Sequence, residues 1–265
     1  MFNIVVCAKA VPDPEDASNI KIDPVTKTLM RGKVSMVLNP LDKNALAAAV
    51  QIKERTEAHI TVISMGPPEA ANVVKECLAL GADRGILLSD RAFGGADTLA
   101  TAFTLAKGIE KNGAFDLILC GMASSDGSTE WVGAQIATFL GAPVGTMVRE
   151  IVECDGDCWK VKADFENGYR LVRMNLPAVL TVTLKLNSPR ALKPSGIIKA
   201  RKKEITQWGI DDLGVSAESV GLKGSPTIVS ALDTIESRRE VEILEGARDE
   251  KTEQLFQKLT DTGLV

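Results

Sequence analysis

The residues best suited to binding a ligand lie in one run near the middle of the chain, "CGMASSDGSTEWVGAQIATFLG" at 120–141. The run leaves an apolar strand pattern and enters a helical pattern. Backbone N–H groups at the start of a helix lack partners inside it and the dipole is positive there, so this junction suits a phosphate group. Glycines permit close approach, and hydroxyl donors are offered by Ser125, Ser128 and Thr129.

A simpler interpretation is that Asp126 and Ser128 only cap the helix. Capping needs one such residue, whereas five lie between 124 and 129, so we favour a nucleotide phosphate. Neither G-x-x-x-x-G-K-[ST] nor G-x-G-x-x-G occurs, so the ligand is not decided by these motifs. A second glycine-rich junction, "FGGADT" at 93–98, is weaker evidence taken alone.

Alternating strand and helix patterns position these junctions. Short apolar runs typical of buried parallel strands occupy 2–10, 59–66, 85–90 and 115–121. Helical patterns occupy 39–55, 67–80, 96–113 and 128–141. Asn39 is placed to cap the first helix, and Gly81 to end the second. The alternation predicts an α/β fold with a doubly wound, mostly parallel sheet.

The pattern changes after Pro143. Turn signals at "CDGDC" (154–158) and "ENG" (166–168) predict antiparallel edge strands over about 148–187. We therefore expect a nucleotide-binding domain at 1–187. Residues 188–265 are expected to form a loop and an extended C-terminal arm that packs on a partner and includes a short helix at 247–263.

Composition excludes several classes of function. The chain has 265 residues, 45% of them hydrophobic and 25% charged, with a net charge of −4. This balance gives no reason to expect binding to nucleic acid or an anionic membrane. No apolar run approaches the roughly 18 residues needed to span a bilayer, and the N-terminus lacks a basic secretory region, so a cytoplasmic protein is expected.

The five cysteines do not predict a metal site. Cys7, Cys77 and Cys120 lie in apolar stretches and are expected to pack as small hydrophobic residues. Cys154 and Cys158 flank an Asp-Gly turn, which could bring their thiols face to face. A metal site needs about four ligands, and the single histidine is distant in sequence, so a plain hairpin is favoured.

Nearly the whole sequence resembles the β subunit of electron-transfer flavoproteins, with its closest likeness to the anaerobic, NADH-linked type that bifurcates electrons. The matching stretches follow one another in the right order, which makes the resemblance specific. They are "VCAKAVPD" (6–13), "KIDPVTKTL" (21–29), "LNPLDKNAL" (38–46), "ITVISMGPP" (60–68), "CLALGADRGILLSDRAFGGADTLAT" (77–101), G-x-x-x-S-D-G-S-T-x-x-V-G (121–133), "LPAVLTVTLKLNSPR" (176–190) and "GIIKARKKEI" (196–205).

The resemblance implies a fold like that of adenine nucleotide α-hydrolases and a heterodimer with a flavin-carrying α subunit. It also implies an adenine nucleotide at the carboxyl end of the sheet, AMP in the simple type and FAD in the bifurcating type. The positions carried over are Ala8, Asn39, Met65, Gly121, Met122, Ser124, Asp126, Gly127, Ser128, Thr129 and Val132. In the bifurcating type, Gly94, Gly95, Asp97 and Thr98 also lie by the dinucleotide.

The resemblance favours FAD over AMP. Bifurcating members read D-G-D-T-A-Q-V-G where this chain reads D-G-S-T-E-W-V-G, so Ser128, Glu130 and Trp131 depart from the pattern. In such systems NADH donates to the β-subunit flavin, one electron reaches ferredoxin or flavodoxin, and the other reaches a dehydrogenase through the α-subunit flavin. No side chain of this subunit is expected to act as an acid, base or nucleophile.

A partner site is implied at 187–200, where the family has a loop that docks an acyl-CoA dehydrogenase. The candidate residues are Arg190, Leu192, Lys193 and Pro194. Ungapped spacing puts Pro194 where the family has an anchoring leucine, so a different flavin dehydrogenase, such as one acting on a 2-hydroxy acid, is an alternative partner. The segment could also be an exposed linker, with "KARKK" (199–203) a solvated basic face.

Two further classes of function remain open. A nucleotide-binding regulatory module of the universal-stress type would share the fold, but it needs neither the edge hairpins nor the C-terminal arm. An adenylating enzyme is disfavoured, because "FGGADT" lies in mid-chain rather than after the first strand.

Overall fold

A computed structural model describes residues 1–13, 35–156, 158–230 and 241–265. The predicted family stretch at 21–29 lies outside these residues. The chain divides into two compact units, Met1–Ser230 and Ala231–Val265. The first unit contains all the strands found among the described residues and carries the candidate site.

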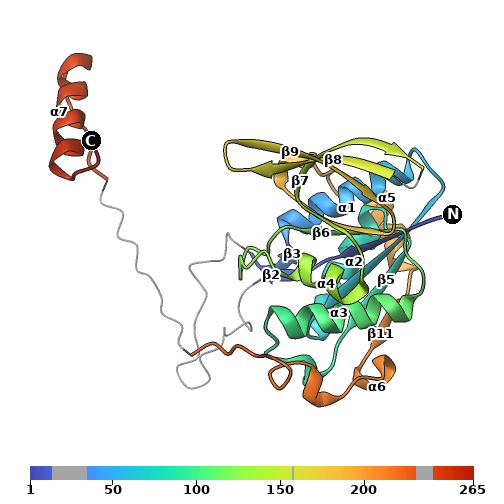
Figure 1. The fold of residues 1–265 in the computed structure, drawn as a ribbon. Coiled ribbons are helices and arrows are strands. Elements are labelled where there is room, and N and C mark those ends of the chain that lie inside the picture. The colour runs from blue at the N-terminus through green and yellow to red at the C-terminus, as the bar shows by residue number, and fades with distance from the viewer. Residues whose placement is uncertain (14–34, 157, 231–240) are drawn as a thin grey trace. The chain divides into compact units, whose positions relative to one another are not determined.

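The first unit is built on a nine-stranded sheet with the order β11-β5-β4-β1-β6-β10-β7-β8-β9 (Figure 1). All neighbours from β11 to β7 run parallel, and β8 and β9 continue the sheet as antiparallel strands. A separate antiparallel pair consists of β2 and β3. The strands are β1 (Phe2–Cys7), β2 (Ala10–Pro12), β3 (Met36–Leu38), β4 (Ala58–Met65), β5 (Arg84–Leu88), β6 (Leu117–Gly121), β7 (Val144–Asp155), β8 (Cys158–Phe165), β9 (Gly168–Asn175), β10 (Ala178–Val182) and β11 (Ile205–Trp208).

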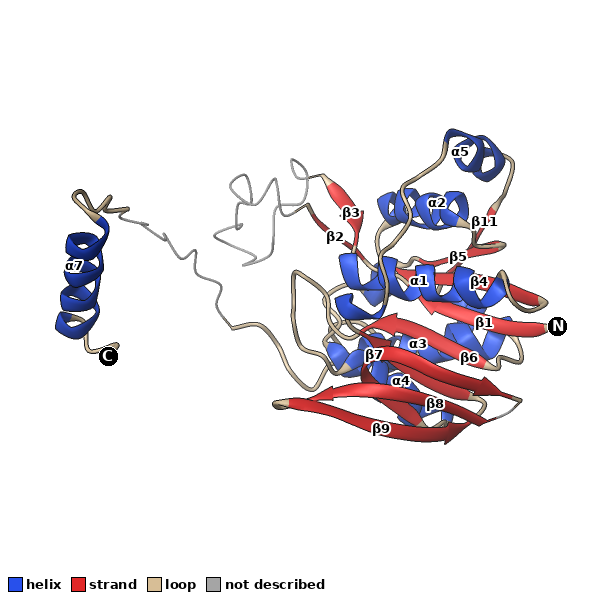
Figure 2. Cartoon of the chain, turned by 90° about the horizontal axis from the view of Figure 1, so that it is seen from above, coloured by secondary structure: helices blue, strands red, loops and turns tan. Residues whose placement is uncertain are grey.

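Helices cover both faces of the parallel part (Figure 2). On one face lie α1 (Pro40–Lys53), α2 (Ala71–Leu80) and α5 (Pro194–Arg201); on the other lie α3 (Thr98–Asn112) and α4 (Val132–Leu140). Alternate residues of β1 enter two different cores, Ile4 and Val6 on the first face and Val5 on the second. Burial on both faces explains why the central strands are continuous apolar runs. The predicted doubly wound α/β fold is confirmed.

Three elements take positions that the sequence patterns did not indicate. β10 falls in the range expected to be antiparallel, yet it runs parallel between β6 and β7, and all five of its residues are buried. An apolar run buried on both faces belongs inside a parallel sheet. β11 and the short α6 (Ile210–Leu213) come from the range assigned to the arm, and β11 pairs with β5 at the edge of the sheet.

Both predicted hairpins form, but the first does not bring two thiols face to face. Asp155 lies opposite Cys158, and Cys154 lies opposite Trp159. Directly paired residues share a face of a sheet and successive residues alternate, so the two cysteines point to opposite faces. Both are free thiols.

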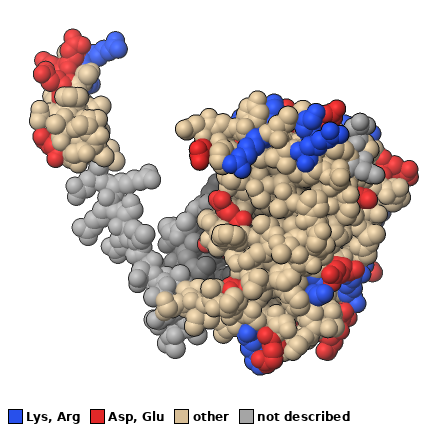
Figure 3. All heavy atoms as spheres, viewed as in Figure 1, with Lys and Arg blue, Asp and Glu red and all other residues tan. Residues whose placement is uncertain are grey.

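Charges on the antiparallel hairpins are arranged as cross-strand pairs. Lys160 Nζ lies 2.6 Å from Glu153 Oε2, and Lys162 Nζ lies 2.8 Å from Glu150 Oε2. In the view of Figure 3, basic side chains gather near the top of the molecule, where Figure 1 shows β8 and β9. Exposed pairs of this kind stabilise a fold by less than about 1 kcal/mol each, so the hairpins depend on the apolar residues of their other face, such as Trp159 and Val161.

The second unit contributes one described helix, α7 (Arg248–Asp261), where a terminal helix was expected. Its apolar residues Leu255 and Phe256 are 49% and 62% exposed. Among the described residues, no helix combines the length and the apolar character required to cross a bilayer.

The packing of α4 on the sheet yields a stability prediction. A Cβ at Gly133 would meet the Thr181 side chain of β10, and it would lie 2.8 Å from Cys120 Sγ of β6. We expect Gly133→Ala to lower the free energy of unfolding by about 1–3 kcal/mol, because neither neighbour can move without disturbing the sheet.

Denaturant unfolding of the purified protein would measure this effect, with Gly168→Ala as the matched control. A Cβ at Gly168 meets nothing within 4 Å, so that variant should unfold like the wild type. Equal stability of the two variants would show that α4 does not rest directly on β6 and β10.

Candidate functional site

Three of the candidate nucleotide-binding residues lie together because their strands are parallel. The register pairs Cys7 with Ile63 between β1 and β4. It pairs Val182 with Gly121 between β10 and β6. The carboxyl ends of these strands therefore share one edge of the sheet, and Ala8, Met65 and Gly121 all lie along it.

Asn39 lies at the N-cap position of α1, as predicted, but its side chain bonds elsewhere. The Asn39 side chain makes no capping hydrogen bond. Instead, its Nδ2 donates to the carbonyl of Ala123 (2.9 Å), and its Oδ1 accepts from the N–H of Ser125 (3.2 Å). Asn39 is 1% exposed, so its amide is a buried connector between the start of α1 and the loop after β6. Local capping preference was overridden by these longer-range partners.

Asp42, in the first turn of α1, joins the ends of two strands. Its Oδ2 accepts from the N–H of Lys9 (2.9 Å), and its Oδ1 accepts from the N–H of Gly121 (2.8 Å). A Cβ at Gly121 would lie 2.6 Å from both Asp42 Oδ1 and Leu41 Cβ, so this position must lack a side chain. Sequence reasoning missed Asp42. The available signal was its position, because Asp42 is an acidic residue in the first turn of a helix that follows the end of a strand.

Residues 128–131 were predicted to form the first turn of the helix, and this prediction is wrong, because they belong to the loop at 122–131. Ser128 and Glu130 have φ of 47° and 63°, in the left-handed region, and α4 begins only at Val132. The loop is closed by a hydrogen bond from the N–H of Ser128 to the carbonyl of Ser124 (2.9 Å). No side chain caps α4, so the interpretation that Asp126 and Ser128 cap it is wrong.

Lys9 is a further site residue that sequence reasoning missed. Its Nζ lies 2.6 Å from Asp126 Oδ1 and 3.2 Å from Ser124 Oγ. Burial tends to raise the pKa of Asp126, but the hydrogen bond and charge of Lys9 outweigh it and lower the pKa below its ordinary value. The sequence signal that could have identified Lys9 was its position two residues after an apolar strand.

The second group of candidate residues, at 94–98, is engaged by a distant segment of the same unit. Gly94 accepts at its carbonyl from the N–H of Leu222 (2.9 Å). Asp97 Oδ1 caps α3 by accepting from the N–H of Ala100 (3.0 Å), and its Oδ2 accepts from Thr227 Oγ1 (2.7 Å). These hydrogen bonds join Gly94 and Asp97 to residues 222–227. Among the described residues, no hydrogen bond joins Gly94 or Asp97 to the loop at 122–131.

The neighbouring Gly95 also lies against this segment. A Cβ at Gly95, whose φ is +73°, would lie 3.1 Å from the Leu222 Cβ. Thr98 is the first residue of α3 and is half-buried. Whether these four residues face a dinucleotide stays a prediction.

The loop at 122–131 leaves its backbone exposed beside the carboxyl ends of β1 and β6. Residues 125–131 are exposed, and a Cβ at Gly127 would have only Ser124 Oγ near it, at 3.4 Å. Ser64 Oγ, at the end of β4 beside Met65, is fully buried and has no hydrogen-bond partner among the described residues. A phosphate at the loop would meet exposed N–H groups, hydroxyls and a cation.

Met122 and Val132 bracket the loop, and both are half-buried. The Met122 N–H donates to the carbonyl of Val182 (2.9 Å), which fixes the start of the loop on β10. Thr129 is exposed between the two left-handed residues. The structure thus brings the first group of candidate residues to one edge.

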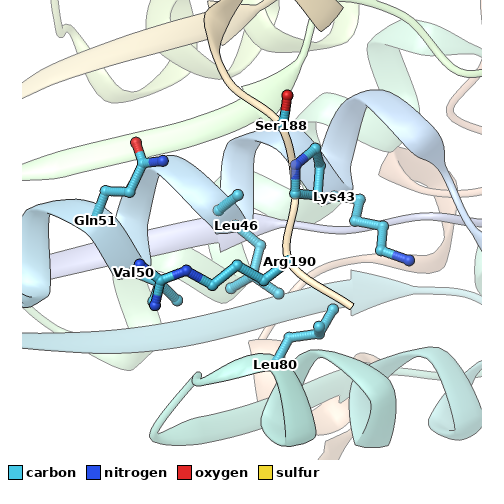
Figure 4. Close-up of a pocket in the computed structure, with 9 residues that line it drawn as sticks. Lys43, Leu46, Val50, Gln51, Leu80, Ser188 and Arg190 are labelled. Carbon is cyan, nitrogen blue, oxygen red and sulfur yellow. The ribbon is translucent and has the colours of Figure 1, made fainter. Parts of the chain in front are cut away.

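The candidate partner-binding residues lie on a separate surface. Arg190 pairs with Glu54, its Nη2 lying 2.9 Å from Oε2. Figure 4 shows the segment with Ser188 and Arg190 crossing α1, over a small pocket that also contacts Leu46 and Leu80. Leu192 is half-buried, and Lys193 and Pro194, which start α5, are exposed.

The basic run at 199–203 is not simply a solvated face. Lys203 Nζ donates to the carbonyl of Ala82 (2.6 Å), and desolvation lowers the pKa of Lys203.

Cys7, Cys77 and Cys120 are buried, as expected, and burial raises the pKa of Cys7 to about 12. Thiols with raised pKa values are poor nucleophiles at neutral pH.

Asp42 predicts a pH dependence of stability. Burial raises its pKa to about 6, despite hydrogen bonds from Lys9 and Gly121 that lower it. Its unfolded value is near ~4, so at intermediate pH the folded chain holds a proton that the unfolded chain has lost. The contribution of Asp42 to the free energy of unfolding is therefore largest below about pH 4 and falls as pH rises towards 6.

We expect a pH change from 7 to 5 to stabilise the wild type by about 1 kcal/mol more than it stabilises Asp42→Asn. Denaturant unfolding of both proteins at the two pH values would measure this. Each protein is compared with itself at the two pH values, so any pH-independent loss of stability caused by the substitution cancels. Parallel pH dependences would contradict the assignment of the raised pKa to Asp42.

Comparison with known proteins assigns the chain to a family. A family model described as "Electron transfer flavoprotein domain" matches residues 26–213. Electron transfer flavoprotein subunit beta from Clostridium acetobutylicum is 45% identical over 260 residues, 98% of each chain. The same subunit from Thermoanaerobacterium thermosaccharolyticum is 44% identical over the full length of both chains.

A third relative bears a more specific name. Caffeyl-CoA reductase-Etf complex subunit CarD from Acetobacterium woodii is 47% identical over 229 residues, 86% of each chain. The family model covers β3 to β11, the loop at 122–131 and every candidate site residue except Ala8. This chain belongs to the electron transfer flavoprotein family, as a member of its beta-subunit group.

Proposed function

We propose that this chain is the FAD-binding β subunit of an electron-bifurcating complex with an α subunit. It would accept electrons from NADH and pass them to ferredoxin or flavodoxin and, through the α-subunit flavin, to a flavin dehydrogenase, or run in the reverse direction. The observation that carries the nucleotide part is the loop at 122–131, fixed to β1 and α1 by Asn39, Asp42 and Lys9. A fixed loop with exposed donors suits a phosphate group.

Residues of this chain would bind and orient the nucleotide rather than move protons. Ala8 and Met65 would border the adenine, and the loop from Ser124 to Thr129 would hold the phosphates. A bound flavin would supply the redox chemistry. The choice of NADH and of ferredoxin or flavodoxin follows from the resemblance to bifurcating members at 89–101 and 126–133.

A dehydrogenase partner is supported by one relative's name, which places CarD in a complex with a caffeyl-CoA reductase. In this chain, we propose that Arg190, Leu192, Lys193 and Pro194 contact such a dehydrogenase. Arg190 is held by Glu54 against α1, so the segment has a defined conformation in which Lys193 and Pro194 are exposed.

AMP in place of FAD is the second candidate, and one observation favours it. Asp97 and Gly94, which would face the dinucleotide in the bifurcating type, already bond to 222–227. AMP needs only the first group of residues. A subunit with AMP would be part of a simple electron shuttle.

The visible spectrum and the acid-released nucleotides of the complex purified with its α partner decide between these functions. Two FAD per heterodimer would support the bifurcating function, and NADH-dependent reduction of ferredoxin is the next assay. One FAD with one AMP would support the simple shuttle. A β subunit without any nucleotide would contradict both.

Gly127 provides a direct test of the loop. We expect Gly127→Val to abolish nucleotide retention at the β-subunit site, because the side chain would enter the space where the exposed backbone meets a phosphate. The protein itself leaves room for a Cβ there, so the melting temperature measured without nucleotide should stay within a degree or two of the wild type. Gly168→Val, at the open start of β9, is the matched control. Full nucleotide content in Gly127→Val would exclude this loop as the phosphate site.

A further inference from the structure

The backbone of Lys9 is fixed on both sides, and its side chain extends over the loop at 122–131. Its N–H donates to Asp42 Oδ2 (2.9 Å), and its carbonyl accepts from the N–H of Asn39 (3.0 Å). With the backbone bonded on both sides, the ammonium group reaches Asp126 Oδ1 at 2.6 Å and Ser124 Oγ at 3.2 Å. Lys9 thus links β1 to the loop through its side chain alone.

The two partners in this ion pair differ in exposure. The Lys9 side chain is 45% exposed, whereas that of Asp126 is 11% exposed. The backbone of Asp126 nevertheless lies on the surface, since the residue as a whole is exposed. An ammonium group has three donors, and the two contacts leave one for a further acceptor. The cation therefore faces outward and covers the carboxylate.

Asp126 would oppose a phosphate in this loop if it were unpaired. Two anions a few ångströms apart repel, and the repulsion is strong where water is partly excluded. The ion pair with Lys9 removes this conflict. A phosphate bound to the exposed N–H groups of the loop would also lie within reach of the remaining donor of Lys9, and it would compete with Asp126 for the same cation.

From this geometry we infer that Lys9 is a phosphate-binding residue of the nucleotide site, and that Asp126 is an internal competitor that positions Lys9 and weakens its hold on the phosphate. The inference rests on the proposed nucleotide binding, but it holds equally for AMP and FAD because both carry an α-phosphate. It predicts opposite effects for the two members of one ion pair.

Binding of AMP, FAD and adenosine to the nucleotide-depleted heterodimer, measured by calorimetry, tests the inference. Lys9→Met should weaken AMP and FAD binding by about tenfold or more, as expected for the loss of a charge-assisted hydrogen bond. Adenosine, which lacks the phosphate, should bind Lys9→Met and the wild type equally. Lys9→Arg, which keeps the charge, should restore most of the AMP affinity.

Asp126→Asn separates binding from positioning. If Asp126 competes for Lys9, this variant should bind AMP as tightly as the wild type or more tightly. If Lys9 only holds the loop in shape, Lys9→Met and Asp126→Asn should weaken binding equally and the double variant should be no worse, which would overturn the inference. Lys107→Met breaks an exposed pair with Glu110 on α3 and should change nothing.

Failure of the inference can be told apart from failure of the proposed function. A wild-type heterodimer that binds AMP or FAD, together with a Lys9→Met variant of unchanged affinity, overturns only the role of Lys9. A wild-type heterodimer that binds neither AMP nor FAD overturns the nucleotide site and the role of Lys9 together.

Discussion

The bridge made by the Asp42 carboxylate is the interaction on which the site depends. One side chain accepts hydrogen bonds from the N–H groups of Lys9 and Gly121, the residues at which β1 and β6 give way to loops. A buried carboxylate with two backbone donors is costly to disturb, because each donor would lose its partner away from water. Asn39 adds a second bridge from the same end of α1 to Ala123 and Ser125. The start of one helix therefore sets the shape of a loop more than 80 residues away.

The absence of side chains is as important here as their presence. Gly121 has no room for a Cβ because Leu41 and Asp42 lie against it, and Gly133 has none because α4 rests on β6 and β10. Gly127 differs, since the protein leaves a Cβ there almost free. Two of these glycines are thus explained by packing within the chain. The third is not explained by packing within the chain.

Sequence reasoning predicted the regular parts of this fold and misjudged parts that depend on distant contacts. The central strands and helices follow from periodicity, since burial on two faces or on one stripe leaves a clear pattern. The start of α4 was placed at Ser128 instead of Val132, because Ser128 and Glu130 adopt left-handed conformations that residue type alone does not indicate. Asn39 looked like a cap, and only the folded chain shows that Ala123 and Ser125 take its amide.

Residues of the site were identified by type and order, but their pairings were not. Asp126 was recognised as a loop residue, while Lys9, 117 positions away, was overlooked because nothing local connects the two. β11 was missed for a similar reason. Four residues, Ile205–Trp208, are too short a run for a periodic pattern, and they become a strand by pairing with β5. Long-range pairing of short segments is the information that a pattern along one chain lacks.

The two aspartates at the edge of the sheet show how one residue type serves two purposes at equivalent places in a fold. Asp97 follows β5, caps α3 through Ala100 and holds Thr227, so its hydrogen bonds are made within the chain. Asp126 follows β6, caps nothing and is neutralised by Lys9. A capped helix start has one fewer free donor, whereas α4 has no side-chain cap and lies behind a loop with an exposed backbone. Of the two junctions, the one at β6 therefore keeps the N–H groups that an anionic ligand requires, and the one at β5 has become part of the framework that carries the chain towards its C-terminal unit.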